Sequence, residues 1–160
     1  GKSNEEGAQR MVQERERGRR VGLLNVGDVA VYSTCWDLYR RVKEMGGQGR
    51  LISGVPSFCA AAARLDVSLV SGSQELHILP ASYQIEEGLK LPGVKVLMKT
   101  GSRIGAVKAL LEEEKCSVQG VKRCGMEGEE IYRSAGEISQ DAGYYSLFIV
   151  RDEKEEKEGR

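Results

Sequence analysis

The sequence predicts an α/β protein of two lobes, with an incomplete first lobe and a second lobe built from a mixed sheet with helices. Strand-like apolar runs alternate with helical periodicity in the first half, whereas several strand-like runs follow one another in the second half. The pattern also begins afresh near residue 75. We therefore assign residues 1–70 to the C-terminal part of a first lobe, 71–152 to a second lobe and 153–160 to a charged tail.

The first half holds two predicted strands and three predicted helices. Residues 4–19 are charged and polar apart from a thin apolar stripe, which is typical of an exposed helix on a sheet edge. Residues 21–26 predict a buried strand. A helical periodicity over residues 34–45 ends at two glycines. Residues 50–53 then predict a short strand, and the alanine-rich stretch 57–65 predicts a short helix.

The second half begins with renewed strand character. The predicted strands lie at residues 76–79, 94–98, 118–123, around 131–132, and 144–150. Between the second and third of these, residues 102–115 place their apolar side chains on one side of a helix. This succession favours a mixed sheet covered by helices.

Composition narrows the classes of function. Lys and Arg number 24 and Asp and Glu number 24, so the net charge of zero gives no electrostatic reason to expect nucleic acid or an acidic membrane surface as a partner. No apolar run approaches the roughly 20 residues of a membrane span, and the first residues lack the apolar core of a signal peptide. We therefore expect a cytoplasmic protein that binds neither nucleic acid nor membrane.

The cysteines argue against a dedicated metal site. They form no C-x-x-C pair, and the chain has a single histidine, His77, to add an imidazole. Buried free thiols in a reducing compartment are the simplest interpretation of all four, ahead of a disulfide or a metal role. These residues are Cys35, Cys59, Cys116 and Cys124.

The loop after the first predicted strand holds candidate binding residues. Gly27 lacks a Cβ, so the chain can turn sharply there or let a ligand touch the backbone, and Asp28 offers a carboxylate. An ordinary turn explains the same pair. Thr34 and Asp37 fit the helix-capping pattern, which needs no ligand.

Two further loops follow predicted strands. Pro56 rigidifies the entry to the alanine-rich helix, whose residues 60–63 are thin enough for a cofactor to approach, although alanine also simply favours helix. Met98 ends a strong strand and leads into Gly101; a methionine in such a place fills a core more often than it binds a ligand.

Conventional catalytic sets are missing from the sequence. There is no G-x-S-x-G elbow, no P-loop and no G-x-G-x-x-G, and the single histidine argues against a His-based triad. No catalytic residue is assigned. This absence suits a reaction whose cofactor brings its own reactivity, such as methyl transfer from a sulfonium, where alignment matters more than acid-base chemistry.

Five blocks of the sequence stand in an informative order. They are Leu-Asn-Val-Gly-Asp with Tyr-Ser-Thr (24–28 and 32–34), Gly-Val-Pro-Ser-Phe-Cys-Ala-Ala-Ala (54–62), Ile-Leu-Pro (78–80), Val-Leu-Met-Lys (96–99) and Tyr-Ser-Leu-Phe-Ile-Val (145–150). Over residues 20–150 the chain thereby resembles the precorrin-2 (cobalt-factor II) C20-methyltransferases of the tetrapyrrole methylase family. The Tyr-Ser-Thr and Gly-Val-Pro blocks together point to the C20 branch.

The resemblance implies a homodimeric, two-lobed methyltransferase of cobalamin biosynthesis that carries S-adenosylmethionine in the cleft between its lobes and methylates C20 of precorrin-2 or cobalt-factor II. Carried over position by position, the cofactor-binding residues are Val26, Gly27, Asp28, Val31, Ser33, Thr34, Ser57, Phe58, Met98 and Gly125, the last with its neighbours Cys124 and Met126. The substrate is a polycarboxylate macrocycle, so the cationic side chains Lys99 and Arg103 are candidates for its acid groups, ahead of the helix residues Arg40 and Arg41.

Two features depart from the family pattern. Nothing like the family's opening strand and Gly-x-Gly-Pro-Gly-Asp loop precedes Val21, and Val29 stands where the family usually has proline after Gly-Asp. Two alternatives to an active C20-methyltransferase therefore stay open. One is a non-catalytic dimerising fragment of the family, and the other is a family member that methylates a different position.

Overall fold

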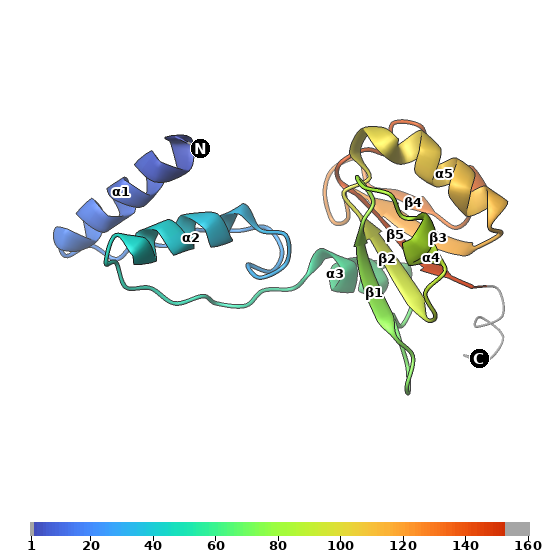
Figure 1. Cartoon of the computed structure of the whole chain (residues 1–160), viewed down its shortest axis with the longest axis horizontal. Helices are drawn as coiled ribbons and strands as arrows, with labels where there is room; N and C mark the ends of the chain where they lie inside the picture. Colours follow the sequence, from blue (N-terminus) through green and yellow to red (C-terminus); the bar gives the residue numbers. More distant parts are fainter. Residues whose placement is uncertain (1, 153–160) are drawn as a thin grey trace. The chain divides into compact units, whose positions relative to one another are not determined.

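The computed structural model describes residues 2–152, and these fall into two compact units that divide between Pro56 and Ser57 (Figure 1). The predicted tail at 153–160 lies outside the described residues. Residues 57–70, which the sequence assigns to the first lobe, belong to the second unit. The assignment of residues 1–70 to a first lobe stays a prediction.

The first unit contains two helices that pack against each other, α1 (Lys2–Glu16) and α2 (Thr34–Glu44). Its buried apolar side chains are Ala8 and Val42. A Cβ placed on Gly7 would lie 3.4 Å from Leu38 Cδ1, so the small residue lets the two helices approach closely. The thin apolar stripe of α1 therefore packs against α2. That this helix also lies on a sheet edge stays a prediction.

The two strands predicted in the first half are also wrong. Residues 21–26 and 50–53 enter no ladder in the structure. Leu24 and Val26 leave 95% and 94% of their surface exposed, and Ile52 leaves 71%. A strand is stable only when its amides and carbonyls pair with a neighbour. Within the described first unit these segments have no strand partner, so their apolar residues alone do not produce a sheet.

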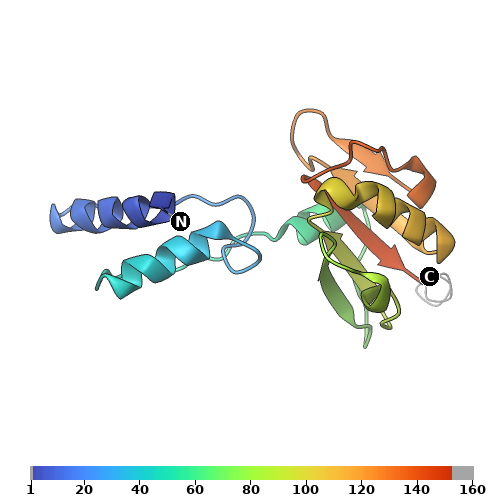
Figure 2. The ribbon, with the colours of Figure 1, turned by 45° about the horizontal axis from the view of Figure 1, so that its top comes forward.

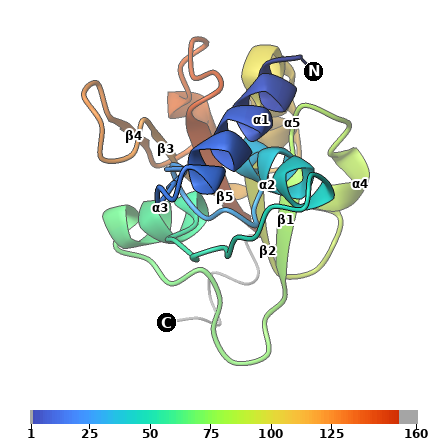
Figure 3. The ribbon, with the colours of Figure 1, turned by 90° about the vertical axis from the view of Figure 1, so that its left-hand side faces the viewer.

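The second unit is a mixed five-stranded sheet with helices, as predicted. Its elements in chain order are α3 (Ser57–Leu65), β1 (Leu76–Pro80), α4 (Glu86–Leu89), β2 (Val94–Met98), η1 (Gly101–Arg103), α5 (Ile104–Glu113), β3 (Ser117–Lys122), β4 (Glu130–Tyr132), η2 (Ala135–Glu137) and β5 (Ser146–Arg151). The predicted helix at 57–65 and strand at 94–98 match their observed bounds. Figure 3 shows the long loop that leads from α3 to β1.

The strand order is β1-β2-β5-β3-β4. β1 runs parallel to β2, whereas β5 runs antiparallel to both of its neighbours, β2 and β3. Because two antiparallel steps restore the direction, β1, β2 and β3 all end at the same edge of the sheet. The loops after β2 and β3 therefore lie at one edge, with a single strand, β5, between them.

Helices cover both faces of this sheet. α5 crosses one face (Figure 2), where Val107 and Leu111 join Leu97, Val118 and Phe148 in one core cluster. The alternate strand residues point to the opposite face because side chains alternate along a strand. They include Val96, Val121 and Ile149, which are buried outside that cluster, and α3 contacts β3 and β5 there.

A buried cation lies within the sheet. Lys95 of β2 is fully buried, and its Nζ lies 3.1 Å from each carboxylate oxygen of Asp152. Such a charge is tolerated inside a protein only when it is paired and hydrogen-bonded. The residue that follows β5 is thereby joined to the second residue of β2.

Substitution of Gly120 should test the packing of the central strands. A Cβ at this position in β3 would overlap the ring of Phe148. We expect Gly120→Ala to reduce the free energy of unfolding by about 1–3 kcal/mol, because the well-packed ring cannot move aside without strain. Urea denaturation followed by fluorescence or circular dichroism measures the change.

Gly105→Ala provides the matched control. Gly105 lies in α5, and an added Cβ would meet nothing within 4 Å. The same substitution there should raise stability by about 0.5–1 kcal/mol, because alanine favours helix over glycine. Equal effects at the two positions would contradict the packing described for Phe148.

Candidate functional site

The loop that follows residues 21–26 is organised by the carboxylate of Asp28. Asp28 Oδ1 accepts a hydrogen bond of 2.7 Å from the Ala30 amide, and Oδ2 accepts one of 2.8 Å from the Gly54 amide. Gly27 adopts a left-handed conformation with φ of 87°, which glycine tolerates without strain. The structure thus brings the first two predicted loops of the first unit together, joined by one side chain.

These hydrogen bonds also determine the charge of Asp28. Its pKa lies below the ordinary value of 3.8, chiefly because the Ala30 amide stabilises the carboxylate and secondly because the Gly54 amide does so. Slight desolvation opposes the shift. Asp28 is therefore an anion throughout the neutral range.

Ser33 and Thr34 begin α2, and the cap differs from the predicted one. The N-cap is Ser33, whose Oγ accepts a hydrogen bond from the Cys35 amide at 3.1 Å, so the assignment of Thr34 as the cap is wrong by one residue. Ser33 Oγ also donates to Asn25 Oδ1 at 3.0 Å. Asn25 closes the loop from Val26 to Ser33, a role that the sequence does not reveal.

Val31 and Tyr32 complete the first loop. The Val31 amide donates to the Asp28 carbonyl at 3.4 Å, which forms a turn within the loop. Tyr32 has φ of 50°, a conformation that side-chain-bearing residues rarely adopt. Backbone strain of this kind concentrates at functional loops.

Ser57 and Phe58 occupy the first turn of α3. Ser57 is exposed, whereas the Phe58 ring is buried within the second unit. Any contact between Phe58 and a ligand would therefore involve its main chain. Cys59, next along the helix, is exposed, and the other three cysteines are only half-buried, so the expectation of buried thiols is wrong.

The loop after β2 combines half-buried site candidates with a strained backbone. Met98 is the last residue of β2, and Lys99 follows with φ of 57°. Thr100 is fully buried, and its Oγ1 donates to the Gly143 carbonyl at 3.1 Å, which ties this loop to the segment before β5. Arg103 is half-buried at the end of η1.

The loop after β3 is held by an acidic side chain that the sequence analysis missed. Gly125, with φ of 71°, donates its amide to Glu129 Oε2 at 2.8 Å, while Arg64 Nε donates to Glu129 Oε1 at 2.7 Å. The Gly125 amide hydrogen bond lowers the pKa of Glu129, with a smaller contribution from Arg64. This amide is therefore already engaged within the chain.

A second acidic residue closes the same loop at the base of the hairpin. Lys122 pairs in register with Glu130, and its Nζ lies 2.9 Å from Glu130 Oε1 and 2.8 Å from Asp141 Oδ2. Hydrogen bonds to these two carboxylates, with Asp141 the larger contributor, raise the pKa of Lys122 to about 12.

The edge of the sheet gathers two of the predicted loops. The segments after β2 and β3 lie at the same edge with only β5 between them, so the strand ends at Met98 and Lys122 stand about 10 Å apart from strand spacing alone. The first residues after these strands, Lys99 and Arg123, both have positive φ. Ligands of α/β proteins commonly bind outside the carboxyl ends of strands, which makes this edge a candidate site.

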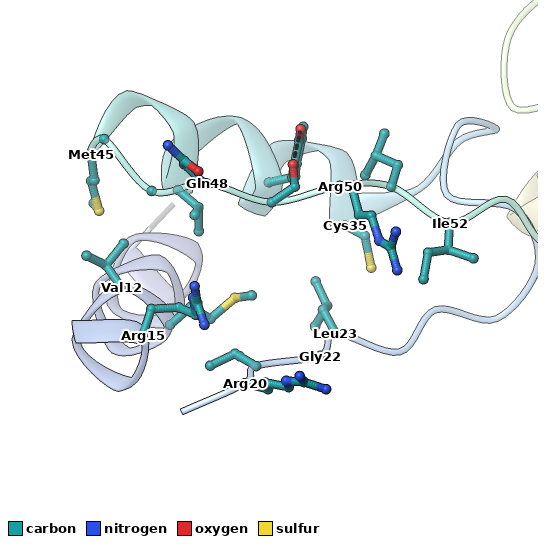
Figure 4. Close-up of a pocket in the computed structure, with 18 of the residues that line it drawn as sticks. Val12, Arg15, Arg20, Gly22, Leu23, Cys35, Met45, Gln48, Arg50 and Ile52 are labelled. Carbon is teal, nitrogen blue, oxygen red and sulfur yellow. Dashed lines mark hydrogen bonds between the residues drawn. The ribbon is translucent and has the colours of Figure 1, made fainter. Parts of the chain in front are cut away.

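A separate hollow of about 950 Å³ lies within the first unit (Figure 4). Its lining comes from α1, α2 and the two extended segments, and includes Val12, Arg15, Leu23, Met45, Arg50 and Ile52. None of the ten residues predicted to bind the cofactor contributes to it. The hollow nevertheless borders the first of these loops, because Val29 is one of its lining residues.

Residues 2–152 contain neither a metal-binding cluster nor a membrane-spanning helix. No group of three or more His, Cys, Asp or Glu side chains stands close enough to hold a metal ion in that part of the chain. Over the same residues, no helix has the length and apolar character required to cross a bilayer.

Residues 1–138 match the family described as tetrapyrrole (corrin/porphyrin) methylases. The chain belongs to this family. The matched stretch of this tetrapyrrole methylase contains all of the site residues predicted from the sequence.

Two curated relatives are similar over most of the chain. A probable cobalt-precorrin-2 C(20)-methyltransferase of Methanocaldococcus jannaschii is 28% identical over 134 residues, which cover 82% of this chain and 58% of the relative. A cobalt-precorrin-2 C(20)-methyltransferase of Salmonella typhimurium is 29% identical over 153 residues, which cover 91% of this chain and 64% of the relative. The tetrapyrrole methylase chain thus spans less than two thirds of either relative's length.

Solved structures share the fold. A cobalt precorrin-4 methyltransferase, CbiF, superposes with a TM-score of 0.77 at 17% identity, covering 92% of this chain and 70% of that one. A uroporphyrin-III C-methyltransferase of Thermus thermophilus, solved in complex with S-adenosylhomocysteine, gives a TM-score of 0.67 at 14% identity, covering 92% and 73%. At this identity the likeness shows the tetrapyrrole methylase fold alone.

Acid should loosen the loop between β3 and β4 before the rest of the second unit. The folded-state pKa values of Glu129, Glu130 and Asp141 are lowered, so their contribution to stability is present above their ordinary values of 4.5, 4.5 and 3.8 and is lost as the pH falls below them. The pKa of Lys122 is raised, so its contribution to the free energy of unfolding is present below pH 10.5 and is lost as the pH rises through about 12. Amide hydrogen exchange at Gly125 between pH 3 and 7, corrected for intrinsic exchange, measures the change.

Glu129→Gln should reproduce this loosening at neutral pH, because the neutral side chain no longer attracts Arg64 and accepts more weakly from the Gly125 amide. Glu127→Gln is the matched control, since Glu127 is an exposed carboxylate in the same loop. Equal protection of the Gly125 amide in both variants would contradict the role of Glu129.

Proposed function

We propose that the chain is an S-adenosylmethionine-dependent methyltransferase that acts on C20 of precorrin-2 or cobalt-factor II in cobalamin biosynthesis. The observation that carries the proposal is the similarity to two relatives named as cobalt-precorrin-2 C(20)-methyltransferases, over 82% and 91% of this chain. The Tyr-Ser-Thr and Gly-Val-Pro blocks at residues 32–34 and 54–56 support the same branch. Family membership alone supports methylation of a tetrapyrrole without its position.

The residues of the predicted loops fit a cofactor that binds through main-chain groups and apolar surface. Val26 and Ser57 are exposed, Met98 is half-buried, and strained backbone occurs at Tyr32 and Lys99. We propose that the cofactor is held by the main chain at Gly27, Val31, Ser57 and Phe58, by the apolar side chains of Val26 and Met98, and by the carbonyl side of Gly125. When bound, S-adenosylmethionine supplies an electrophilic methyl group on its sulfonium.

The chain's own contribution to such a reaction is alignment. Methyl transfer needs the nucleophilic carbon, the methyl group and the leaving sulfur in line, and needs no acid-base pair at the reacting atoms. We propose that Lys99 and Arg103, which flank the strand edge, bind carboxylates of the macrocycle. Arg40 is a weaker candidate, because its guanidinium group already has two carboxylate neighbours on the exposed side of α2. Its Nη2 lies 3.8 Å from Asp37 Oδ1, and its Nε lies 4.0 Å from Glu44 Oε1.

Calorimetric titration with S-adenosylhomocysteine tests the cofactor assignment. We expect the 160-residue chain to bind S-adenosylhomocysteine. Val26→Ser should weaken this binding roughly tenfold, because the substitution removes the isopropyl group and with it the apolar contact to the cofactor. Leu24→Ser is the matched control, since Leu24 and Val26 are exposed to the same degree, 95% and 94%, so neither change disturbs packing. Equal affinity of both variants would remove Val26 from the proposed site.

A non-catalytic fragment of the family is the second candidate. One observation favours it: among residues 2–152, the segments 21–26 and 50–53 have no strand partner. This candidate predicts dimers that transfer no methyl group. Incubation with radiolabelled S-adenosylmethionine and precorrin-2 separates the two, because label in the macrocycle would eliminate the non-catalytic reading.

We further propose that the protein is a cytoplasmic homodimer that binds neither nucleic acid nor membrane. Light scattering measures the mass of the particle in solution and so tests the dimer.

Methylation at another ring carbon is the remaining alternative within the family. Assignment of the labelled methyl group by NMR of the product distinguishes C20 from every other position.

A further inference from the structure

The side chain of Asp28 joins two loops that lie far apart in the sequence. Its two oxygens accept from the amides of Ala30 and Gly54, at 2.7 and 2.8 Å, and the second bond spans 26 residues. The first bond is the local contact expected of an aspartate in a turn. The second is not local, and it attaches the Gly54-Val55-Pro56 segment to the Gly27-Asp28 turn.

The backbones of these two loops are also in direct contact. A Cβ placed on Gly54 would lie 2.5 Å from the Gly27 carbonyl oxygen and 3.7 Å from Asp28 Cα. A Cβ on Gly27 would lie 3.9 Å from the Val55 carbonyl oxygen. Only a residue without a side chain fits at Gly54 while the Asp28 hydrogen bond is kept, so the contact depends on both residues.

The contact has few other supports among the described residues of the first unit. Residues 21–26 and 50–53, which lead into the two loops, form no ladder that could hold them in place. Val55 is 64% exposed and Val26 is 94% exposed, so apolar packing contributes little to this contact. The carboxylate is therefore the principal interaction that fixes one loop against the other.

We propose that Asp28 is a positioning residue, whose carboxylate joins the Gly27 turn to the Gly54 segment and so holds the main chain at Val26-Gly27 and Gly54-Pro56 in the shape that receives the cofactor. The part that concerns the cofactor rests on the proposed function. The side chain of Asp28 is then not itself a cofactor contact, because both of its oxygens are engaged by backbone amides.

NMR of the full chain labelled with ¹⁵N tests the junction without any ligand. In Asp28→Asn one side-chain oxygen remains for a single amide, whereas the new NH₂ group cannot accept from the other. We expect the Gly54 amide proton to lose its downfield shift and to exchange with solvent roughly tenfold faster, while the Ala30 amide changes less. Unchanged Gly54 signals would overturn the junction.

Gly54→Ala disturbs the junction from the other side and leaves the Asp28 carboxylate in place. We expect the added Cβ to force the two loops apart. The amide proton at position 54 should then lose its downfield chemical shift, as it does in Asp28→Asn. Asp37→Asn is the control, because Asp37 is an exposed carboxylate of the same unit whose contact with Arg40 is long, at 3.8 Å. Unchanged dispersion of the second-unit signals shows that each variant is folded.

Calorimetry with S-adenosylhomocysteine then tests the link to the cofactor. We expect Asp28→Asn and Gly54→Ala to weaken binding by a similar factor, roughly tenfold or more, and Asp37→Asn to leave it unchanged. If both variants lose the Gly54 amide signature yet bind as tightly as the wild-type chain, the positioning role is overturned. If the wild-type chain itself does not bind, the proposed function fails, whereas the NMR result still decides whether Asp28 joins the loops.

Discussion

Backbone pairing between strands is the constraint on which the rest of this structure depends. In the second unit, β5 lies between β2 and β3 and pairs with both, so five short strands become one sheet. In the first unit, residues 21–26 and 50–53 also carry apolar side chains but have no strand partner among the described residues, and they remain largely exposed. The two units differ because only the second offers each strand a neighbour to pair with. Backbone amides and carbonyls that have no such partner are more stable when they stay hydrogen-bonded to water.

This constraint also explains which parts of the fold could be predicted. The bounds of α3 and β2 follow from local signals, a run of alanines after proline and an apolar stretch after glycine, and the structure matches both. The strands at 21–26 and 50–53 fail because pairing depends on residues elsewhere, which periodicity does not report. The helix cap is Ser33 and not the predicted Thr34 because a serine hydroxyl caps a helix as well as a threonine does, whereas the spacing to Asp37 pointed to Thr34.

The candidate site was predictable in outline only. Spacing indicated the loops after residues 26, 53 and 98, and the structure joins the first two through Asp28. Glu129 accepts from the Gly125 amide, four residues before it, and from Arg64, which lies 65 positions away, and no sequence pattern marks either contact. Asp28 and Glu129 share one feature: a carboxylate that accepts from a backbone amide, of Gly54 and Gly125 respectively, gives each loop a fixed shape that glycine alone would leave free. That these loops bind one common ligand stays a prediction.

The central place of β5 has a consequence for how the protein is made. β2 and β3 emerge from the ribosome well before residues 146–151, yet they touch each other only through β5. The nascent chain must therefore carry two open sheet edges until its last described strand inserts between them. Long-range closure of this kind is slow and leaves apolar edges available for wrong association, so the chain would be most vulnerable to aggregation before β5 has been synthesised.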